Sequence, residues 1–335
     1  MDKVLITGAS GFIGAHLAQA NLARGRLVRA LVLPGDAAGP GLAGRGVEVI
    51  AGDIRDGEAV RKAAAGVDLI FHAAALVSDW GPPELFQGVT VRGAENICRA
   101  ALAAGVRRLV HISTNDVFGR DESVTFDESF PLASWGEPYP DAKIAAEKIC
   151  WKYCRDQGLP VAMVYPCWVY GEGDQTFVPL LADAILKREM VFWRRDVLVW
   201  PTYIENLVDL MMLIADDDRA AGQGFLVHDG RSVTLREFCD GVAAAVGAAP
   251  ARLRLPYPAA LAAALVMEKV WKLLRIQQRP LLTTYTVKNL GSRLKFSIAK
   301  AERVLGWKPP VDYPTGFSRT MAWLQGLDPG RLKNK

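Results

Sequence analysis

The stretch VLITGASGFIG, residues 4–14, decides the fold. Its first residues form an apolar run that ends at a glycine, which predicts a short buried strand of a parallel sheet. The apolar spacing that follows predicts a helix. Gly8 permits a tight turn, Gly11 lets the backbone approach a phosphate, and Gly14 lets the helix pack closely on the strand. Because free N–H groups at the start of a helix attract anions, the stretch predicts a binding site for the pyrophosphate of a dinucleotide.

Strand and helix patterns alternate from this stretch to about residue 170. Apolar runs predict strands at 4–7, 27–33, 47–51, 67–73, 108–113 and 161–165, and helical spacing predicts helices at 12–24, 58–65, 85–104 and 139–157. This alternation predicts an α/β fold, a Rossmann-type doubly wound parallel sheet. We expect the dinucleotide-binding domain to span residues 1–170, with a strand and a helix added by residues 200–230. The remainder, residues 171–335, predicts a smaller, mostly helical substrate-binding lobe.

The composition is that of an ordinary globular protein and excludes several classes. The 335 residues are 50% hydrophobic and 23% charged, which excludes a disordered chain. The 40 basic and 36 acidic residues leave a net charge of only +4, and no basic stripe indicates a nucleic-acid partner. The five cysteines form no CxxC pair and the four histidines have no metal-ligand spacing, so we expect no metal site and a reducing, cytoplasmic location. The chain enters a strand at once and has no long apolar run, so neither a signal peptide nor a membrane-spanning helix is expected.

Tyr139 and Lys143 carry the predicted chemistry. They stand four residues apart in a predicted helix and therefore on one helical face. A phenol with a pKa of about 10 is a poor base at neutral pH, and a neighbouring ammonium lowers that pKa. Ser113 and Thr114 stand at the end of the fifth predicted strand, at the edge where a doubly wound sheet binds its ligands. A hydroxyl there can hold a substrate oxygen while Tyr139 gives or takes a proton.

Eight motifs together resemble the extended short-chain dehydrogenase/reductase family, also called the NAD-dependent epimerase/dehydratase family. They are TGASGFIG (7–14), GDIRD (52–56), FHAAA (71–75), HISTNDVFG (111–119), YPDAK (139–143), YPCWVYGEGD (165–174), TYIEN (202–206) and LGWKPPVDYPTGF (305–317). The resemblance implies an enzyme with Thr114, Tyr139 and Lys143 as its catalytic residues. The cofactor-binding residues that the glycine motif and the resemblance imply are Gly8, Ser10, Gly11, Phe12, Ile13, Gly14, Asp53, Ile54, Ala73, Ala74, Ala75, Pro166 and Val169. The resemblance also implies a homodimer formed through the helices at 85–104 and 139–157.

The end of the second predicted strand bears on the choice between NAD and NADP. An acid about 20 residues after the glycine motif would bind the ribose hydroxyls of NAD, and an arginine would bind the phosphate of NADP. Val32 and Leu33 occupy these positions, and the nearest acid, Asp36, follows Pro34 and Gly35. The cofactor is therefore NAD or NADP, and the missing acid favours NADP.

Several features favour an apolar substrate. The TYIEN run resembles the 3β-hydroxysteroid dehydrogenase and sterol dehydrogenase branch, and no asparagine follows the sixth predicted strand, where sugar-nucleotide epimerases often use one. Six aromatic residues can form apolar pocket walls, although most of the tryptophans can equally belong to the core: Trp80, Trp135, Trp168, Phe192, Trp193 and Trp200. We therefore expect hydride transfer between a nicotinamide and a secondary alcohol or ketone, on a 3β-hydroxysteroid, a sterol or a long-chain β-hydroxy or β-keto acid.

Two other functions stay open. A sugar-nucleotide epimerase or dehydratase with tightly bound NAD is the first, because Lys187, Arg188, Arg194 and Arg195 could hold a phosphate-rich substrate. A nucleotide-sensing regulator is the second, although a sensor does not need the three catalytic side chains.

Residues 256–279 combine an apolar helical stretch with a basic, tryptophan-bearing end. Such a segment can lie in a membrane interface or can pack as a helix over the substrate pocket. Peripheral membrane contact is therefore a further hypothesis.

Overall fold

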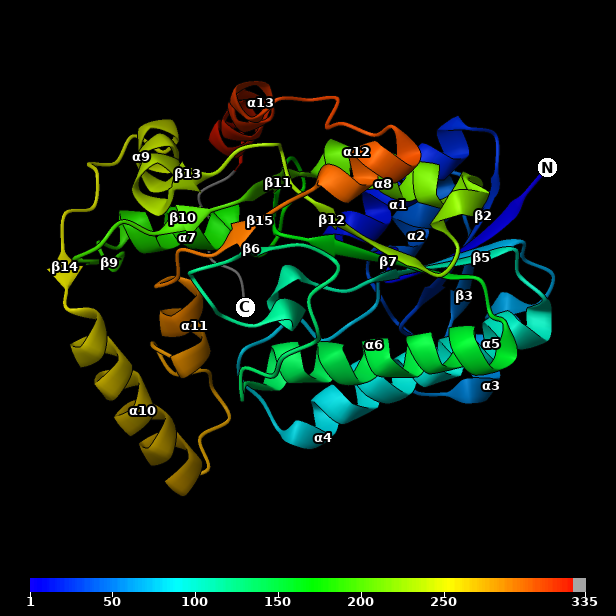
Figure 1. Cartoon of the computed structure of the whole chain (residues 1–335), viewed down its shortest axis with the longest axis horizontal. Helices are drawn as coiled ribbons and strands as arrows, with labels where there is room; N and C mark the ends of the chain where they lie inside the picture. Colours follow the sequence, from blue (N-terminus) through cyan, green and yellow to red (C-terminus); the bar gives the residue numbers. More distant parts are fainter. Residues whose placement is uncertain (328–335) are drawn as a thin grey trace.

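A parallel sheet of seven strands forms the centre of the computed structural model, which describes residues 1–327 (Figure 1). The strand order is β12-β7-β5-β4-β1-β2-β3, and every neighbouring pair is parallel. The strands are β1 (Lys3–Thr7), β2 (Leu27–Val32), β3 (Glu48–Ala51), β4 (Leu69–His72), β5 (Arg108–Ile112), β7 (Val161–Pro166) and β12 (Gln223–Val227). The predicted Rossmann-type sheet is confirmed.

Helices cover both faces of the sheet, as its apolar strands require. One face carries α3 (Gly57–Ala64), α4 (Pro83–Phe86), η1 (Gln87–Arg92), α5 (Gly93–Ala104) and α6 (Pro138–Gln157), and the other carries α1 (Phe12–Ala23), α2 (Gly39–Gly44), α8 (Ile204–Asp216) and α12 (Ala299–Leu305) (Figure 1). The side chains of β1 divide between these layers: Val4 and Ile6 pack with α1 and α8, whereas Leu5 packs with α3 and α5. The predicted helix at 85–104 is a continuous helical run from α4 to α5 with a π-helical middle, η1.

The second half of the chain builds a helical layer beyond the carboxyl edge of the sheet. Its helices are α7 (Val178–Leu186), α9 (Leu235–Ala245), α10 (Tyr257–Leu273), α11 (Thr284–Asn289) and α13 (Tyr313–Gln325). Two 3-10 turns lie outside this layer: η2 (Asn115–Phe118) follows β5, and η3 (Asp218–Ala220) follows α8. Four short two-stranded pairs lie outside the central sheet: β6 (Thr125–Phe126) with β15 (Lys295–Phe296), β8 (Trp168–Tyr170) with β11 (Pro201–Tyr203), β9 (Phe192–Trp193) with β14 (Arg254–Leu255), and β10 (Leu198–Val199) with β13 (Val233–Thr234). The strand β12 from this half completes the central sheet beside β7.

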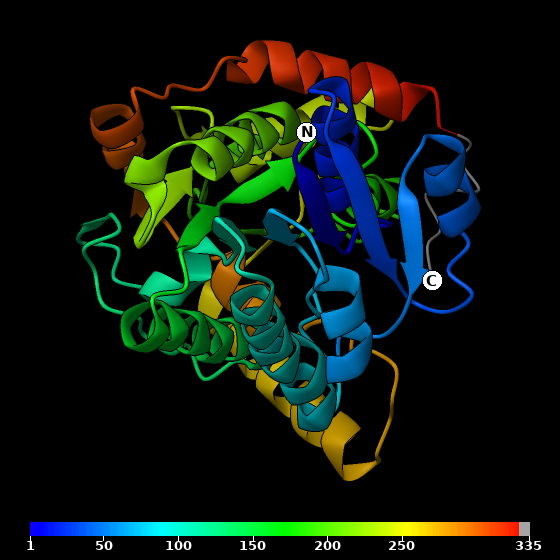
Figure 2. The same ribbon diagram turned by 90° about the vertical axis from the view of Figure 1, so that its right-hand side faces the viewer.

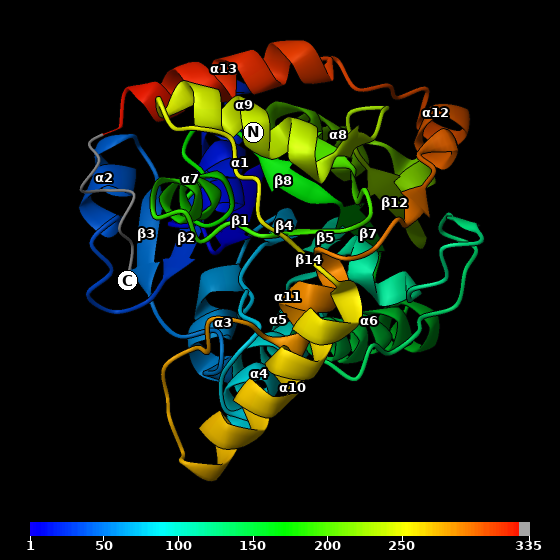
Figure 3. The same cartoon turned by 90° about the vertical axis from the view of Figure 1, so that its left-hand side faces the viewer.

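The helix α10 lies at the periphery of the molecule. Figures 2 and 3 show it projecting at the end opposite α13, with α11 beside it in Figure 3. Only Ala260 and Ala264 of its 17 residues are buried. Within residues 1–327, no helix is long and apolar enough to cross a membrane.

Candidate active site

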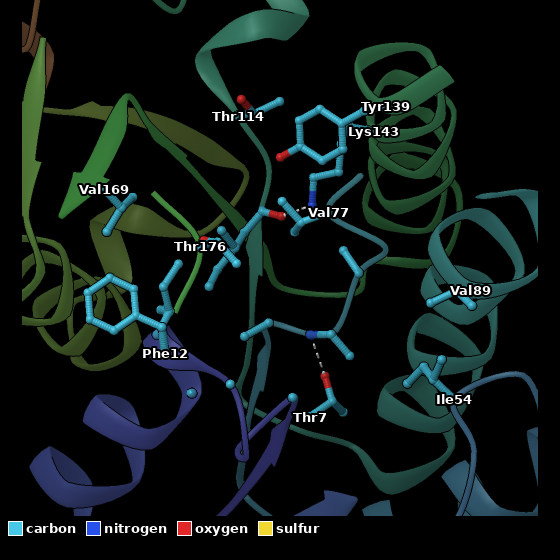
Figure 4. A pocket seen from close by; sticks show the side chains of 18 of the residues that line it. Thr7, Phe12, Ile54, Val77, Val89, Thr114, Tyr139, Lys143, Val169 and Thr176 are labelled. Carbon is cyan, nitrogen blue, oxygen red and sulfur yellow. Dashed lines mark hydrogen bonds between the residues drawn. The ribbon is translucent and has the colours of Figure 1, made fainter. Parts of the chain in front are cut away.

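A cavity of about 780 Å³ lies where the carboxyl ends of β1, β2, β4, β5 and β7 meet (Figure 4). Every catalytic and cofactor-binding residue named from the sequence lines it. These are Gly8, Ser10, Gly11, Phe12, Ile13, Gly14, Asp53, Ile54, Ala73, Ala74, Ala75, Thr114, Tyr139, Lys143, Pro166 and Val169. The fold therefore brings into one space residues that are up to 161 positions apart in the sequence.

The glycine loop is packed too closely for side chains. Gly8 has a φ of +71°, and a Cβ added there would lie 2.9 Å from the backbone nitrogen of Ala74. A Cβ at Gly14 would lie 2.1 Å from the carbonyl oxygen of Gly8. Gly11 precedes α1, and no side chain caps this end of the helix. No side-chain cap therefore occupies the first N–H groups of α1 at the cavity. These groups can donate hydrogen bonds to a bound pyrophosphate.

The loop after β4 is fixed over the glycine loop by a buried hydrogen-bond chain. The backbone N–H of Ala74 donates to Oγ1 of Thr7 at 3.2 Å (Figure 4). Oγ1 of Thr7 also lies 2.8 Å from Nδ1 of His72. Burial, together with the nearby charge of Lys143, lowers the pKa of His72 to about 3. His72 is therefore neutral at physiological pH and acts as a hydrogen-bonding support below the site.

Tyr139 and Thr114 direct their side chains toward the same part of the cavity, with Lys143 one helical turn beyond Tyr139 (Figure 4). The ammonium of Lys143 donates to the carbonyl oxygen of Ile112, and burial lowers the pKa of Lys143 to about 8. Burial and the charge of Asp116 raise the pKa of Tyr139, and the hydroxyl of Thr114 opposes them only in part. The sequence predicts a lowered tyrosine pKa, but in this arrangement the pKa of Tyr139 is raised, because burial and the charge of Asp116 act on it.

Glu147 is a buried carboxylate one turn after Lys143 on α6. Its Oε2 accepts from Oγ of Ser113 at 2.7 Å, and its Oε1 accepts from the hydroxyl of Tyr165 at 2.7 Å and from Nε1 of Trp151 at 3.0 Å. These bonds tie α6 to the ends of β5 and β7. The spacing of four from Lys143 is the sequence signal that could have identified this residue.

Three further lining residues were not foreseen and meet beside Tyr139. The hydroxyl of Tyr285 donates to Oδ2 of Asp116 at 2.7 Å, and Nδ2 of Asn289 donates to the hydroxyl of Tyr285 at 3.0 Å. The rings of Tyr285 and Tyr139 stand edge to face with centroids 6.1 Å apart. Burial raises the pKa of Asp116 to about 6. Tyr285 and Asn289 come from α11, whose position no pattern near Tyr139 could reveal.

The predicted aromatic walls are mostly wrong. Of the six residues, only Trp168 lines the cavity, where it packs on Phe177 with ring centroids 5.0 Å apart. Trp135, Phe192 and Trp193 are buried elsewhere in the core, because large rings gain more by complete burial than by lining an open pocket.

The predicted phosphate-binding cations also lie outside the cavity lining. Lys187 pairs with Asp183 at 2.6 Å, and Arg195 pairs with Glu122 at 2.7 Å.

The carboxylate of Asp36 is closer to the site than its position in the sequence implies. Asp36 lines the cavity together with Leu33, and its Oδ1 accepts from the backbone N–H of Ala38 at 2.9 Å. Arg55 also lines the cavity, but its guanidinium is bound by both carboxylate oxygens of Asp53, at 2.6 to 3.0 Å. The turn at Pro34 and Gly35 folds Asp36 back toward the cavity.

The first crossover of the sheet carries a glycine loop, and a tyrosine and a lysine share one helix at the carboxyl edge. This is the arrangement of nicotinamide-dependent oxidoreductases of the extended short-chain type. Residues 4–227 match the NAD dependent epimerase/dehydratase family, and the chain belongs to this family. It is an NAD-dependent dehydrogenase or reductase by class.

Characterised relatives cover nearly the whole chain. It is 30% identical over 329 residues to a 3-beta-hydroxysteroid dehydrogenase of Mycolicibacterium neoaurum, covering 92% of this chain and 87% of that protein. It is 31% identical over 335 residues to a 2-alkyl-3-oxoalkanoate reductase of Stenotrophomonas maltophilia, covering 96% and 98%. The crystal structure of a dTDP-glucose 4,6-dehydratase of Streptomyces venezuelae with NAD bound shares the fold, with a TM-score of 0.78 at 24% identity over 96% of this chain and 97% of that one.

Proposed function

We propose that the protein interconverts a secondary alcohol and a ketone on an apolar substrate, either a 3β-hydroxysteroid or sterol or a long-chain β-hydroxy or β-keto acid. The observation that carries this proposal is the meeting of the Thr114 and Tyr139 hydroxyls in a cavity that also exposes apolar side chains. The apolar lining includes Val77, Leu85, Val89, Trp168 and Phe177. The names of the steroid dehydrogenase and oxoalkanoate reductase relatives fit the two substrate classes.

Thr114, Tyr139 and Lys143 have different roles in this proposal. The bound nicotinamide supplies or accepts the hydride. Thr114 donates a hydrogen bond to the substrate oxygen, and Tyr139 transfers a proton to or from the same oxygen. Tyr139 holds its proton at neutral pH and can donate this proton when a ketone is reduced. Lys143 holds the nicotinamide ribose and keeps a positive charge near the oxygen that gains negative charge.

The absorbance of the reduced nicotinamide tests this proposal directly. The purified protein is given NAD⁺ or NADP⁺ with a 3β-hydroxysteroid, a long-chain β-hydroxy acid or a UDP-sugar. Net reduction of the nicotinamide with one of the first two substrates is the expected result. Conversion of the UDP-sugar without net reduction, by protein that copurifies with NAD, would instead establish the epimerase or dehydratase alternative.

The sugar-nucleotide alternative is less well supported by the cavity. Among the lining residues of the described chain, the cationic side chains are Arg55 and Lys143. Asp53 binds the first, and the carbonyl of Ile112 binds the second. A nucleotide diphosphate substrate would need further cations, and the four that the sequence suggested lie outside the lining.

The cofactor preference that we propose is NAD rather than NADP. The apolar Val32 and Leu33 favour NADP on sequence alone, but Asp36 lines the cavity as Leu33 does. A carboxylate here accepts hydrogen bonds from ribose hydroxyls and repels the additional phosphate of NADP. Arg55, which could attract that phosphate, is engaged by Asp53.

Dissociation constants for NADH and NADPH test this preference. We expect NADH to bind at least ~10-fold more tightly, about 1.4 kcal/mol. Asp36→Ser should remove most of the difference. Equal affinities for the two cofactors in the wild type would contradict the proposed role of Asp36.

We also propose that this protein is cytoplasmic and contacts the membrane peripherally through residues 256–279. On α10, Val266 is 61% exposed and Leu273 is 82% exposed, and Lys269 and Lys272 lie beside them in the sequence. An exposed apolar face with neighbouring cations suits the surface of an anionic bilayer. Flotation with phosphatidylserine vesicles at low salt tests this contact, with Leu273→Ser as the disruptive change and Leu186→Ser, on α7, as the control. Failure of the wild type to float would end the hypothesis.

A homodimer through α5 and α6 remains a proposal that rests on the family resemblance. These two helices lie side by side on one face of the sheet (Figure 1). Light scattering after size exclusion distinguishes a dimer from the monomer of 36.5 kDa.

A further inference from the structure

Asp79 joins two segments of the chain that meet at the edge of the cavity. It stands in the loop between β4 and α4, two residues after Val77. Val77 lines the cavity although it is 70% exposed, so the cavity opens to solvent at this loop (Figure 4). Nε and Nη2 of Arg279 donate to the two carboxylate oxygens of Asp79, each at 2.6 Å. Arg279 belongs to the segment between α10 and α11, which the ion pair therefore ties to the loop.

The same carboxylate holds the first turn of α11. The hydroxyls of Thr283 and Thr286 donate to Oδ2 of Asp79 at 2.6 and 2.7 Å. Thr283 also caps α11, because its Oγ1 accepts from the backbone N–H of Thr286 at 3.1 Å. Burial opposes ionisation of Asp79, but the bonds from Arg279 outweigh burial and lower its pKa, so the group is a carboxylate at neutral pH. We call Asp79, Arg279, Thr283 and Thr286 the latch.

The helix that the latch holds lies beside the catalytic tyrosine. Tyr285 and Asn289 stand four residues apart on α11 and therefore on one helical face, and both line the cavity. The ring of Tyr285 stands edge to face with that of Tyr139, with centroids 6.1 Å apart. A displacement of α11 would therefore change the wall of the cavity next to Tyr139.

A second acid also holds α11, on the side of α6. Glu137 directly precedes α6, accepts from the hydroxyl of Thr284 at 3.1 Å and pairs with Lys288. Glu137 stands two residues before Tyr139, so changing it would disturb the catalytic helix as well. Among the residues that the structure describes, the latch residues are not part of the cavity lining, which allows them to be changed separately. With Glu137 intact, loss of the latch should loosen α11 without detaching it.

We propose that Asp79 is a positioning residue for the substrate, which holds α11 so that Tyr285 and Asn289 form one wall of the substrate site beside Tyr139. Its effect on the substrate rests on the proposed function, whereas the tie between Asp79 and α11 does not. Because the latch lies outside the glycine loop and the catalytic set, its loss should weaken substrate binding and leave cofactor binding unchanged.

Amide hydrogen exchange tests the tie without any substrate. Mass spectrometry follows peptides that span residues 279–290 in the wild type and in Asp79→Ala. Within α11, the N–H of Val287 donates to the carbonyl of Thr283 and the N–H of Leu290 donates to that of Thr286. We expect these amides to exchange at least ~10-fold faster in the variant, while those of β1 and β4 keep their rates.

Steady-state kinetics test the consequence for the substrate. NADH is used with 5α-dihydrotestosterone or with a long-chain 3-oxo ester. For the ketone that the wild type reduces, Asp79→Ala should raise KM at least ~10-fold, with kcat and the dissociation constant of NADH changed by less than ~3-fold. A general loss of stability would not separate KM from kcat in this way.

Variants at the arginine provide a second route and a matched control. The side chain of Arg279 is 47% exposed, so Arg279→Ala should fold and should show the same two effects as Asp79→Ala. In the double variant, KM should match that of the more affected single variant, because both changes break one interaction. The control is Arg319→Ala, whose side chain is 49% exposed and pairs with Glu205 at 3.0 Å between α13 and α8. It should leave exchange of α11 and KM unchanged.

Each contrary result has a separate meaning. Unchanged exchange of α11 in Asp79→Ala and Arg279→Ala overturns the latch, and so does exchange that accelerates equally in β1 and β4. Faster exchange of α11 with an unchanged KM overturns the positioning of the substrate, as do additive effects in the double variant. If Asp79→Ala does not fold, Arg279→Ala decides both points. A wild type that reduces neither ketone refutes the proposed function, and the exchange experiment still decides whether Asp79 holds α11.

Discussion

Gly14→Ala offers a quantitative test of how the glycine loop binds the cofactor. The new Cβ would stand 2.1 Å from the carbonyl oxygen of Gly8 and 2.8 Å from Cα of Ala9, and both neighbours are backbone. Ordinary contact begins at 3.4 Å, so α1 and the loop must separate by about 1.3 Å. A hydrogen bond of about 2.9 Å that is stretched by this amount is lost.

The expected loss of affinity follows from that displacement. Hydrogen bonds to a charged group contribute about 1.5–3 kcal/mol each, so losing two of those to the pyrophosphate costs at least ~3 kcal/mol. This corresponds to a rise in the dissociation constant of NADH of more than ~100-fold. Overpacking costs roughly 1–3 kcal/mol of unfolding free energy, which leaves a domain of ordinary stability folded and measurable.

Titration of NADH fluorescence measures the affinity, and thermal unfolding checks the fold. The matched control is Gly44→Ala on α2, where a Cβ would meet nothing within 4 Å. The control should bind NADH like the wild type. A Gly14→Ala protein that binds NADH within threefold of the wild type would refute the reasoning, because the loop would then not need close packing to hold the cofactor.

Three other changes probe side chains of the candidate site. Tyr139→Phe should lower turnover at least ~100-fold with NADH affinity unchanged, and undiminished turnover would remove its proposed role. Burial lowers the pKa of Lys143 from 10.5 to about 8, so the unfolded chain binds more protons between these pH values. From pH 8 to pH 10.5, the free energy of unfolding of the wild type should therefore rise by up to roughly 3 kcal/mol relative to that of Lys143→Met. Chemical denaturation of both proteins measures this difference, and parallel pH profiles would contradict the prediction. Glu147→Leu leaves the hydroxyls of Ser113 and Tyr165 without their acceptor and should destabilise the protein by roughly 3–5 kcal/mol in urea. Glu147→Gln retains an acceptor and should lose less stability. An equal loss of unfolding free energy in Glu147→Leu and Glu147→Gln would argue against this explanation.

The sheet and the cofactor half of the site could be predicted from the sequence because their signals are local. A buried parallel strand is a short apolar run, and Gly14 is needed because a Cβ there would meet the backbone of Gly8 and Ala9, its near neighbours in the chain. Tyr139 and Lys143 share a helix, so their spacing alone places them on one face.

The rest of the site depends on contacts between distant segments. Tyr285 and Asn289 reach Tyr139 only because α11 folds against the end of α6 and η2, which no periodicity encodes. The sequence could not tell which tryptophans line the cavity, because an aromatic residue suits a core as well as a pocket. Asp36 shows that prediction can also fail for residues close in the sequence, because the turn after β2 determines whether Asp36 lines the cavity.

The position of β12 has a consequence for vectorial synthesis on the ribosome. The strand β7 ends at Pro166, but its outer partner, Gln223–Val227, is made almost 60 residues later. Until then the nascent chain presents β7 as an open edge with unpaired backbone groups, which is the kind of surface that recruits other strands. Slow translation between these two points would therefore prolong an aggregation-prone intermediate, and pulse-labelled ribosome complexes stalled before and after residue 227 should differ in chaperone binding.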